Sequence, residues 1–125
     1  MLEKNITEKN IETFVIKFYT KIMEDDEVGP FFIGILGDDI NNKKWKEHIE
    51  VLSDFWASVT LGHRSYMGSP FAPHRQLQGL KRETFYRWLE IFFKTLDETY
   101  ENETSLVFKE TGSIMAQNFM RNLKL

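Results

Sequence analysis

Hydrophobic residues in the first part of this chain recur at the spacing of one buried helix face. Between Thr7 and Glu24 they fall at the i, i+3, i+4 and i+7 positions of an amphipathic helix. These residues are Ile11, Phe14, Val15, Phe18, Tyr19, Ile22 and Met23. Thr7 is the predicted N-cap, although Asn10 in place of Glu or Gln makes an imperfect capping box. The helix is predicted to stop before Val28-Gly29-Pro30, because proline disfavours helical backbone at the preceding residue.

Three later segments show the same periodicity and are predicted to be helices over residues 42–61, 81–100 and 103–123. Their predicted inward residues are Trp45, Ile49, Leu52, Phe55, Trp56 and Val59 in the first, Phe85, Trp88, Leu89, Phe92, Phe93 and Leu96 in the second, and Val107, Ile114, Met115 and Phe119 in the third. Residues 29–42 contain three glycines and are predicted to form one helical turn and an irregular loop that packs inward. No segment alternates with a period of two, so we predict an all-α fold in a single domain over residues 1–125.

Composition excludes several classes of protein. The chain has 125 residues and no cysteine, so disulfides, thiolate metal sites and a cysteine nucleophile are excluded. A net charge of −3 without a basic run argues against a nucleic-acid partner. The N-terminus is polar, and no window approaches the roughly 18 continuous apolar residues of a membrane span, so we expect no membrane partner and a cytoplasmic protein.

Common catalytic and metal-binding motifs are also missing. None of the three histidines has a Glu three residues before it or a second His four residues away, which excludes a di-iron carboxylate bundle and a zinc helix. The serine-hydrolase elbow and the glycine-rich phosphate loops are absent as well. His48 on an aromatic helix face and His74 in a short post-proline helix remain, and two imidazoles across an aromatic space would suit a planar metallo-macrocycle. By themselves they are a weak signal, because a single histidine on an apolar helix face is more often a core or edge residue than a ligand.

Four ordered blocks of residues give a more specific indication. They are Phe18-Tyr19 with Gly29-Pro30-Phe31-Phe32, then Trp45-Lys46-Glu47-His48 with Phe55-Trp56, then Pro70-Phe71-Ala72-Pro73-His74, and lastly Phe85-Tyr86-Arg87-Trp88-Leu89. From about Asn10 to Leu123 the chain resembles the group III truncated haemoglobins of bacteria. The resemblance implies a shortened globin fold, in which two antiparallel helix pairs form a two-over-two sandwich around haem b.

The resemblance also implies roles for individual residues. His74 matches the ligand of the haem iron, while Phe32 and Leu52 match residues that pack against the haem. Arg75, beside His74, is a candidate partner of a haem propionate, as are Lys46 and Arg64, but the resemblance does not fix these three. Tyr19, Trp88 and His48 match the distal residues, which face the bound gas on the opposite side of the haem.

A phenol and an indole are hydrogen-bond donors suited to O2 that has taken electron density from ferrous iron. We therefore expect a monomeric haem protein that binds O2, NO or CO, supported by a reductase of unknown identity. Because two donors would slow O2 release, redox chemistry on NO or peroxide is expected rather than oxygen transport, and no catalytic residue is assigned. One alternative is a haem-free globin-like sensor or interaction domain. Another is a six-coordinate haem, with His48 as the second axial ligand.

Overall fold

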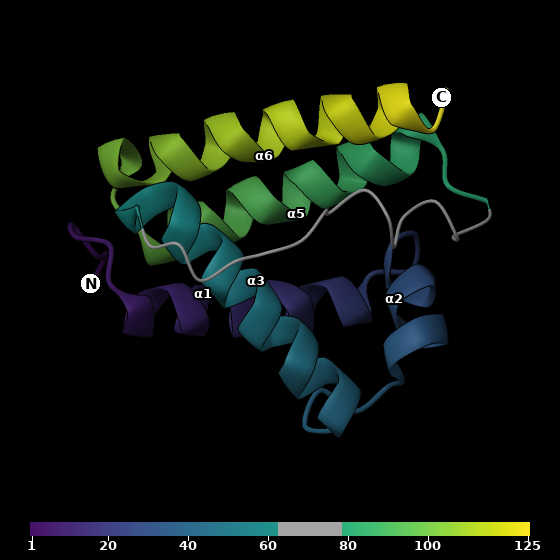
Figure 1. The fold of residues 1–125 in the computed structure, drawn as a ribbon, viewed down its shortest axis with the longest axis horizontal. Coiled ribbons are helices and arrows are strands. Elements are labelled where there is room, and N and C mark those ends of the chain that lie inside the picture. Colours follow the sequence, from purple (N-terminus) through teal and green to yellow (C-terminus); the bar gives the residue numbers. More distant parts are fainter. Residues whose placement is uncertain (63–78) are drawn as a thin grey trace.

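The computed structural model describes residues 1–62 and 79–125, which form five helices in two layers (Figure 1). The helices are α1 (Glu8–Glu24), α2 (Gly29–Leu36), α3 (Lys43–Leu61), α5 (Arg82–Thr99) and α6 (Asn102–Asn122). Helix α1 packs against α3 in one layer, and α5 and α6 lie side by side and antiparallel in the other. The layers meet mainly where α1 contacts α5 and where α3 contacts α6. This arrangement is the all-α sandwich that the sequence predicts.

The predicted ends of the long helices agree with the structure to within one residue. Thr7 is the N-cap of α1, and its Oγ1 accepts the Asn10 N–H at 3.1 Å while Asn10 Oδ1 accepts the Thr7 N–H at 2.9 Å. The side-chain oxygen of Asn10 therefore completes the capping box, in the place where Glu or Gln is usual. Asn42 caps α3 through the Trp45 N–H, and Gly62 ends it in the left-handed conformation at φ 73°.

Residues 29–36 differ from the prediction, since they form an eight-residue helix rather than a single turn. Pro30 lies in the first turn, where its missing N–H costs nothing. Gly29 lets the start of α2 approach the end of α1, since a Cβ there would lie 2.8 Å from the Ile22 carbonyl oxygen. Gly34 is exposed and touches nothing within 4 Å, so it weakens the helix without breaking it. The loop predicted from three glycines was therefore wrong for residues 29–36, which are helical.

The predicted inward face of α6 was partly wrong. Val107 and Ile114 are exposed at 37% and 50%, whereas Met115 is half-buried and Phe119 is buried. Three of the buried positions of α6 are instead small residues, namely Ser105, Gly112 and Ala116. The other buried positions are Phe108, Phe119 and Met120. Small side chains bring α6 close to α5, and a pattern based on hydrophobicity alone does not identify them.

The N-terminal segment is joined to the turn between α5 and α6. The Glu3 N–H donates to the Thr99 carbonyl, the Glu101 N–H donates to the Glu3 carbonyl, and both bonds are 2.9 Å long. The Tyr100 hydroxyl donates to Asn10 Oδ1 at 2.7 Å. This junction therefore ties the start of α1 to the opposite layer.

Candidate functional site

Tyr19 lies on the inner face of α1 and is only 4% exposed. No hydrogen bond joins its hydroxyl to any residue in the described ranges 1–62 and 79–125. Burial raises the pKa of the Tyr19 phenol, so it stays protonated in any physiological buffer. Tyr19 is thus a neutral donor held in a largely dry environment.

Rings from two other helices, α2 and α3, surround Tyr19. Its ring centroid lies 4.9 Å from that of His48 and 5.7 Å from that of Trp45, both on α3, and 5.4 Å from that of Phe32 on α2. The ring centroid of His48 also lies 6.1 Å from that of Phe32 and 5.7 Å from that of Trp45. We call these four residues the distal ring cluster. It brings together three of the residues that the sequence assigned to the site, namely Tyr19, Phe32 and His48.

Trp45 holds the start of α3 against the end of α2. Its side chain is fully buried, its indole Nε1–H donates to the Gly37 carbonyl at 2.7 Å, and its backbone N–H donates to Asn42 Oδ1 at 2.8 Å. The Asn42 amide in turn donates to the Leu36 carbonyl at 2.8 Å. His48, one turn further along α3, is therefore presented from a fixed helix start.

Trp88 approaches the same region from α5. Its ring meets the Phe18 ring edge-on at 5.4 Å and stacks on the Phe92 ring at 5.0 Å. Phe18 also contacts the Tyr19 ring at 4.9 Å, so Phe18 touches both predicted donors. Trp88 is half-buried, and within the described part of the chain its indole N–H has no hydrogen-bond partner. The Tyr19 hydroxyl and the Trp88 indole N–H, two donors without a partner in the described part of the chain, thus belong to rings on either side of Phe18.

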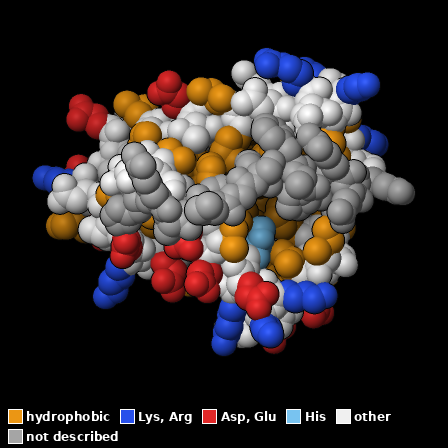
Figure 2. All heavy atoms as spheres, viewed as in Figure 1, with side chains coloured by type: hydrophobic (Ala, Val, Ile, Leu, Met, Phe, Trp, Pro, Cys, Tyr) orange, Lys and Arg blue, Asp and Glu red, His pale blue; other side chains and the backbone are white. Residues whose placement is uncertain are grey.

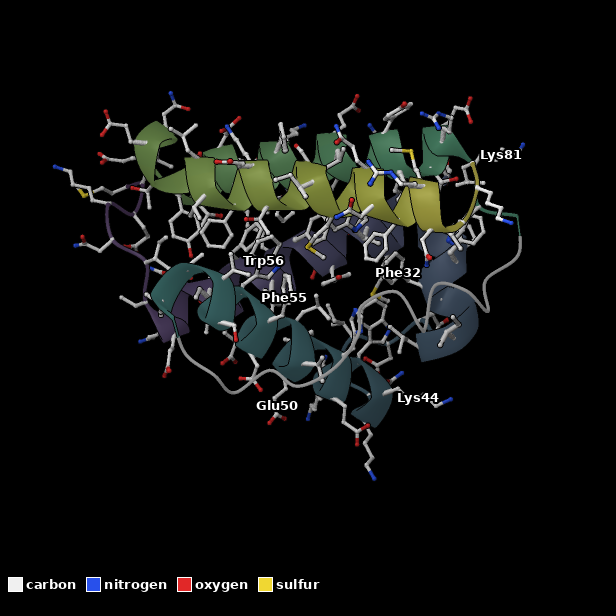
Figure 3. The ribbon with its side chains drawn as sticks, turned by 45° about the horizontal axis from the view of Figure 1, so that its top comes forward. Phe32, Lys44, Glu50, Phe55, Trp56 and Lys81 are labelled. Atoms are coloured by element: carbon white, nitrogen blue, oxygen red, sulfur yellow. The ribbon has the colours of Figure 1, made fainter. Side chains whose placement is uncertain are left out.

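Half-buried apolar side chains lie at the edge of the core near these donors. Leu52, one turn after His48, is one of them, and the others that pack on this core include Phe32, Phe55, Val59, Trp88, Phe93 and Met115. Figure 2 shows hydrophobic side chains on the middle of this face and charged ones around its margin. In Figure 3, Phe32, Phe55 and Trp56 point between the layers, whereas Lys44 and Glu50 point outward. This apolar margin suits a flat apolar group.

The two remaining predicted site residues, His74 and Arg75, lie outside the described residues, as do His63 and Arg64. Lys46 is exposed on α3. Within the described ranges, no group of three or more His, Asp or Glu side chains is placed to hold a metal ion, and no helix there is long and apolar enough to cross a membrane.

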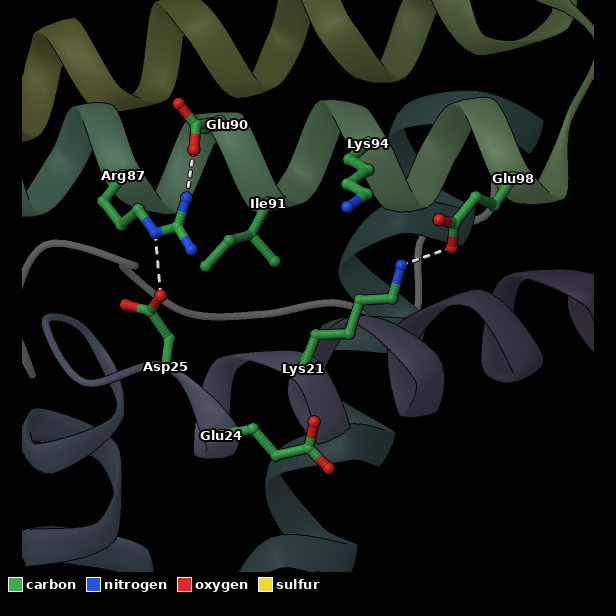
Figure 4. Close-up of a pocket in the computed structure, with 8 residues that line it drawn as sticks. All are labelled: Lys21, Glu24, Asp25, Arg87, Glu90, Ile91, Lys94 and Glu98. Carbon is green, nitrogen blue, oxygen red and sulfur yellow. Dashed lines mark hydrogen bonds and ion pairs between the residues drawn. The ribbon is translucent and has the colours of Figure 1, made fainter.

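A separate, strongly charged cleft lies between α1 and α5 (Figure 4). Its lining residues are Lys21, Glu24, Asp25, Arg87, Glu90, Ile91, Lys94 and Glu98. Most of these charges are already paired with one another: Arg87 pairs with Asp25 and Glu90, and Lys21 pairs with Glu98. The cleft therefore does not select a ligand of either sign.

Sequence reasoning missed the site roles of Phe18 and Trp45 and the pairing of Asp25 with Arg87. Phe18 and Trp45 were predicted only as inward residues, since hydrophobic periodicity cannot distinguish a core ring from one that contacts a site. Asp25 precedes a Gly-Pro turn, which is a local signal for a side chain that accepts backbone N–H groups. Its partner is 62 residues away along the chain, and no local pattern identifies it.

The chain resembles known proteins over nearly its whole length. It is 30% identical over 120 residues to a curated group 3 truncated haemoglobin, ctb, of Campylobacter jejuni, and the match covers 96% of this chain and 93% of that protein. A crystal structure of a group III truncated haemoglobin from Campylobacter jejuni has a TM-score of 0.90 at 30% identity, covering 98% of this chain and 95% of that one. No family model matches the chain.

Proposed function

Because this chain belongs to the group III truncated haemoglobins, we propose that it binds haem b and holds a diatomic ligand such as O2, NO or CO beside Tyr19 and Trp88. His74 is proposed as the protein ligand of the iron. The observation that carries the proposal is the pair of donors around Phe18: both belong to buried or half-buried side chains and neither has a partner among the described residues.

The described residues fit a haem in two respects. A hydroxyl that is shielded from water gains from a hydrogen-bond partner, so the hydroxyl of the nearly buried Tyr19 suits a site where a polar ligand is present in the working protein. Phe32 and Leu52 are half-buried at the margin of the core, which suits contact with the apolar surface of a macrocycle. We propose that these two residues pack against the haem and that Arg75 pairs with a propionate.

Haem iron, when bound, supplies the coordination position at which a diatomic ligand is held and polarised. The chain's own contribution is to orient and stabilise that ligand. The Tyr19 O–H and the Trp88 Nε1–H donate to a ligand atom that carries partial negative charge, and the surrounding rings keep water away and strengthen both bonds. His48, whose ring lies 4.9 Å from that of Tyr19, is proposed to control access at the margin of the distal ring cluster.

Two donors favour retention of the ligand over its rapid release. We therefore propose redox chemistry rather than oxygen transport, with conversion of NO as the first candidate. In that reaction NO, O2 and one electron give nitrate, so a one-electron reductant must supply the protein. Peroxide reduction is the second candidate, and it consumes two electrons and two protons per peroxide. We infer that a monomer is sufficient, since all the proposed site residues come from one chain.

The absorbance spectrum of the purified protein after haem addition tests the haem proposal. A Soret band is expected in the wild type and is expected to be lost or strongly changed in His74→Ala. His63→Ala is the matched control, because His63 has no assigned role, and it should leave the band unchanged. A folded, colourless protein would contradict the proposal and favour a haem-free sensor or interaction domain. An unchanged band in His74→Ala would overturn the assignment of that residue.

A further inference from the structure

The carboxylate of Asp25 lies at the point where three helices meet. It follows the last residue of α1, and its side chain is only 7% exposed. Its Oδ2 accepts the backbone N–H groups of Glu27 at 3.1 Å and Val28 at 2.9 Å, and its Oδ1 accepts Arg87 Nε–H from α5 at 2.7 Å. One buried side chain thus fixes the turn from α1 into α2 and joins that turn to α5.

Each of these three helices carries a residue of the proposed haem site. Tyr19 lies on α1, Phe32 lies on α2, which begins directly after Val28, and Trp88 directly follows Arg87 on α5. A change at Asp25 would therefore shift the relative positions of all three helices. The hydrogen-bond partners that the structure gives the Asp25 carboxylate are Glu27, Val28 and Arg87, and none of them belongs to the distal ring cluster, so we expect Asp25 to act through the helices it joins.

Arg87 is suited to a fixed geometry because its planar guanidinium makes two directed contacts. Nε donates to Asp25, and Nη1 pairs with Glu90, one turn further along α5 (Figure 4). The Arg87 and Glu90 side chains are 40% and 67% exposed, so the bond from Arg87 to the nearly buried Asp25 is the contact that fixes the stretch of α5 carrying Trp88. A lysine would keep the charge but would lose the second directed donor.

A second set of ion pairs between the same two helices provides a built-in comparison. Lys17 and Lys21 on α1 both pair with Glu98 on α5, and all three side chains are between 29% and 42% exposed. These exposed pairs make no hydrogen bond to α2 and lie more than two helical turns from Trp88 along α5. Exposed pairs of this kind contribute little to stability or to a fixed geometry.

Resting on the haem function proposed above, we propose that Asp25 and Arg87 are positioning residues that hold Trp88 against Phe18, in register with Tyr19 and Phe32. They touch neither haem nor gas. They determine instead how well the two distal donors converge on one ligand atom, and hence how long the ligand stays bound.

The test compares haem-loaded Arg87→Lys and Asp25→Asn with Glu98→Gln, the matched control for a lost ion pair between α1 and α5. Both site variants should release O2 about three- to tenfold faster, which lies in the lower part of the typical coupling between neighbouring residues. They should also move the C–O stretch of the carbonyl complex to higher frequency and shift the NMR signal of the Trp88 indole N–H. Glu98→Gln should change none of these readouts.

A double-mutant cycle separates positioning from general destabilisation. If Arg87 acts through Trp88, then Arg87→Lys should have no further effect on O2 release in a Trp88→Phe background. An equal effect in that background, an equal effect of Glu98→Gln, or unchanged spectra in both site variants would each overturn the inference. A wild type without a Soret band would instead overturn the proposed haem function, so the two failures are distinguishable.

Discussion

Phe92 lies against the backbone of Gly112, where α5 and α6 cross. A Cβ atom on Gly112 would be 2.6 Å from Cε2 of Phe92, well inside contact distance. Phe92 is fully buried and stacks on Trp56 at 5.3 Å and on Trp88 at 5.0 Å. The missing side chain of Gly112 therefore makes room for a ring that supports one of the two proposed donors.

Gly112→Ala is expected to lower stability although it lies in a helix. Alanine in place of glycine in a helix interior normally stabilises by about 1 kcal/mol. Here the added methyl group must displace a ring that is packed on two sides, and such overpacking costs about 1–3 kcal/mol. We expect a net loss of up to about 2 kcal/mol in the free energy of unfolding, measured by urea denaturation.

Gly34→Ala is the matched control for that substitution. Gly34 is also within a helix, but it is exposed and has no atom within 4 Å of its would-be Cβ. The same chemical change should therefore stabilise the protein by about 0.5–1 kcal/mol. Equal effects of the two substitutions would contradict the close contact between Gly112 and Phe92.

Removing either proposed donor should speed the release of oxygen. A hydrogen bond to a charged group contributes about 1.5–3 kcal/mol, so Tyr19→Phe and Trp88→Phe are each expected to raise the O2 dissociation rate by about tenfold to a hundredfold. Stopped-flow displacement of O2 by CO measures this rate. Tyr86→Phe is the control, because Tyr86 is 52% exposed on α5 and should have no effect. Unchanged rates in both site variants would remove the donor role and leave haem binding intact.

Tyr19→Phe should have the opposite effect on the stability of the chain without haem. The Tyr19 residue is only 4% exposed, and no residue in the described part of the chain makes a hydrogen bond with its hydroxyl. Deleting an unsatisfied polar group in such a place is neutral or stabilising, by up to about 1 kcal/mol. Thermal unfolding of the haem-free protein followed by circular dichroism checks this. A clear loss of stability would indicate that the hydroxyl has a structural role instead.

Acid should weaken the junction at Asp25. Burial alone would raise the pKa of Asp25, but N–H groups of Val28, Arg87 and Glu27 donate to its carboxylate and, with the Arg87 charge, hold the pKa below its ordinary value. A lowered pKa in the folded state means that the stabilisation is complete above the ordinary value of about 3.9 and is lost as pH falls through it toward the folded pKa. We therefore expect a loss of stability that begins below about pH 5.

The measurement is the unfolding temperature at about pH 6 and about pH 3. Asp25→Asn should be less stable than the wild type at the higher pH, by about 1–3 kcal/mol, and should show a smaller loss on acidification. Lys21 and Glu24 from α1 and Arg87 and Glu90 from α5 line the same cleft in both proteins, so the difference between the two proteins, and not either loss alone, reports on Asp25. Parallel losses in the two proteins would contradict the assignment to Asp25.

Local rules predicted the long helices of this fold well. Thr7 and Asn42 are N-caps because their side chains accept backbone N–H groups three residues ahead, a relationship visible within four residues of sequence. The same rules failed for α2, where Gly34 is tolerated at the surface, and for α6, where Gly112 packs against a distant ring. In both cases the effect of the glycine depends on its tertiary environment, and local sequence rules do not predict that environment.

Prediction of the site has a similar limit. Tyr19, His48 and Phe32 were expected at one site, and the structure brings their rings within 4.9–6.1 Å of one another. The Phe18 ring on α1 contacts both its neighbour Tyr19 and Trp88 on α5. The spacing of residues along one helix does not predict such a contact between two helices. The role of His74 stays a prediction.

The tie between the Tyr100 hydroxyl and Asn10 has a consequence for the newly made chain. Asn10 belongs to the cap that starts α1, yet its partner is 90 positions further along, and Thr104 binds the Lys4 carbonyl across 100 positions. During synthesis on a ribosome, the local cap between Thr7 and Asn10 can form early, but its tie to the opposite layer must wait until most of the polypeptide has emerged. Contacts between such distant residues close long loops, so this junction is expected among the last parts to form.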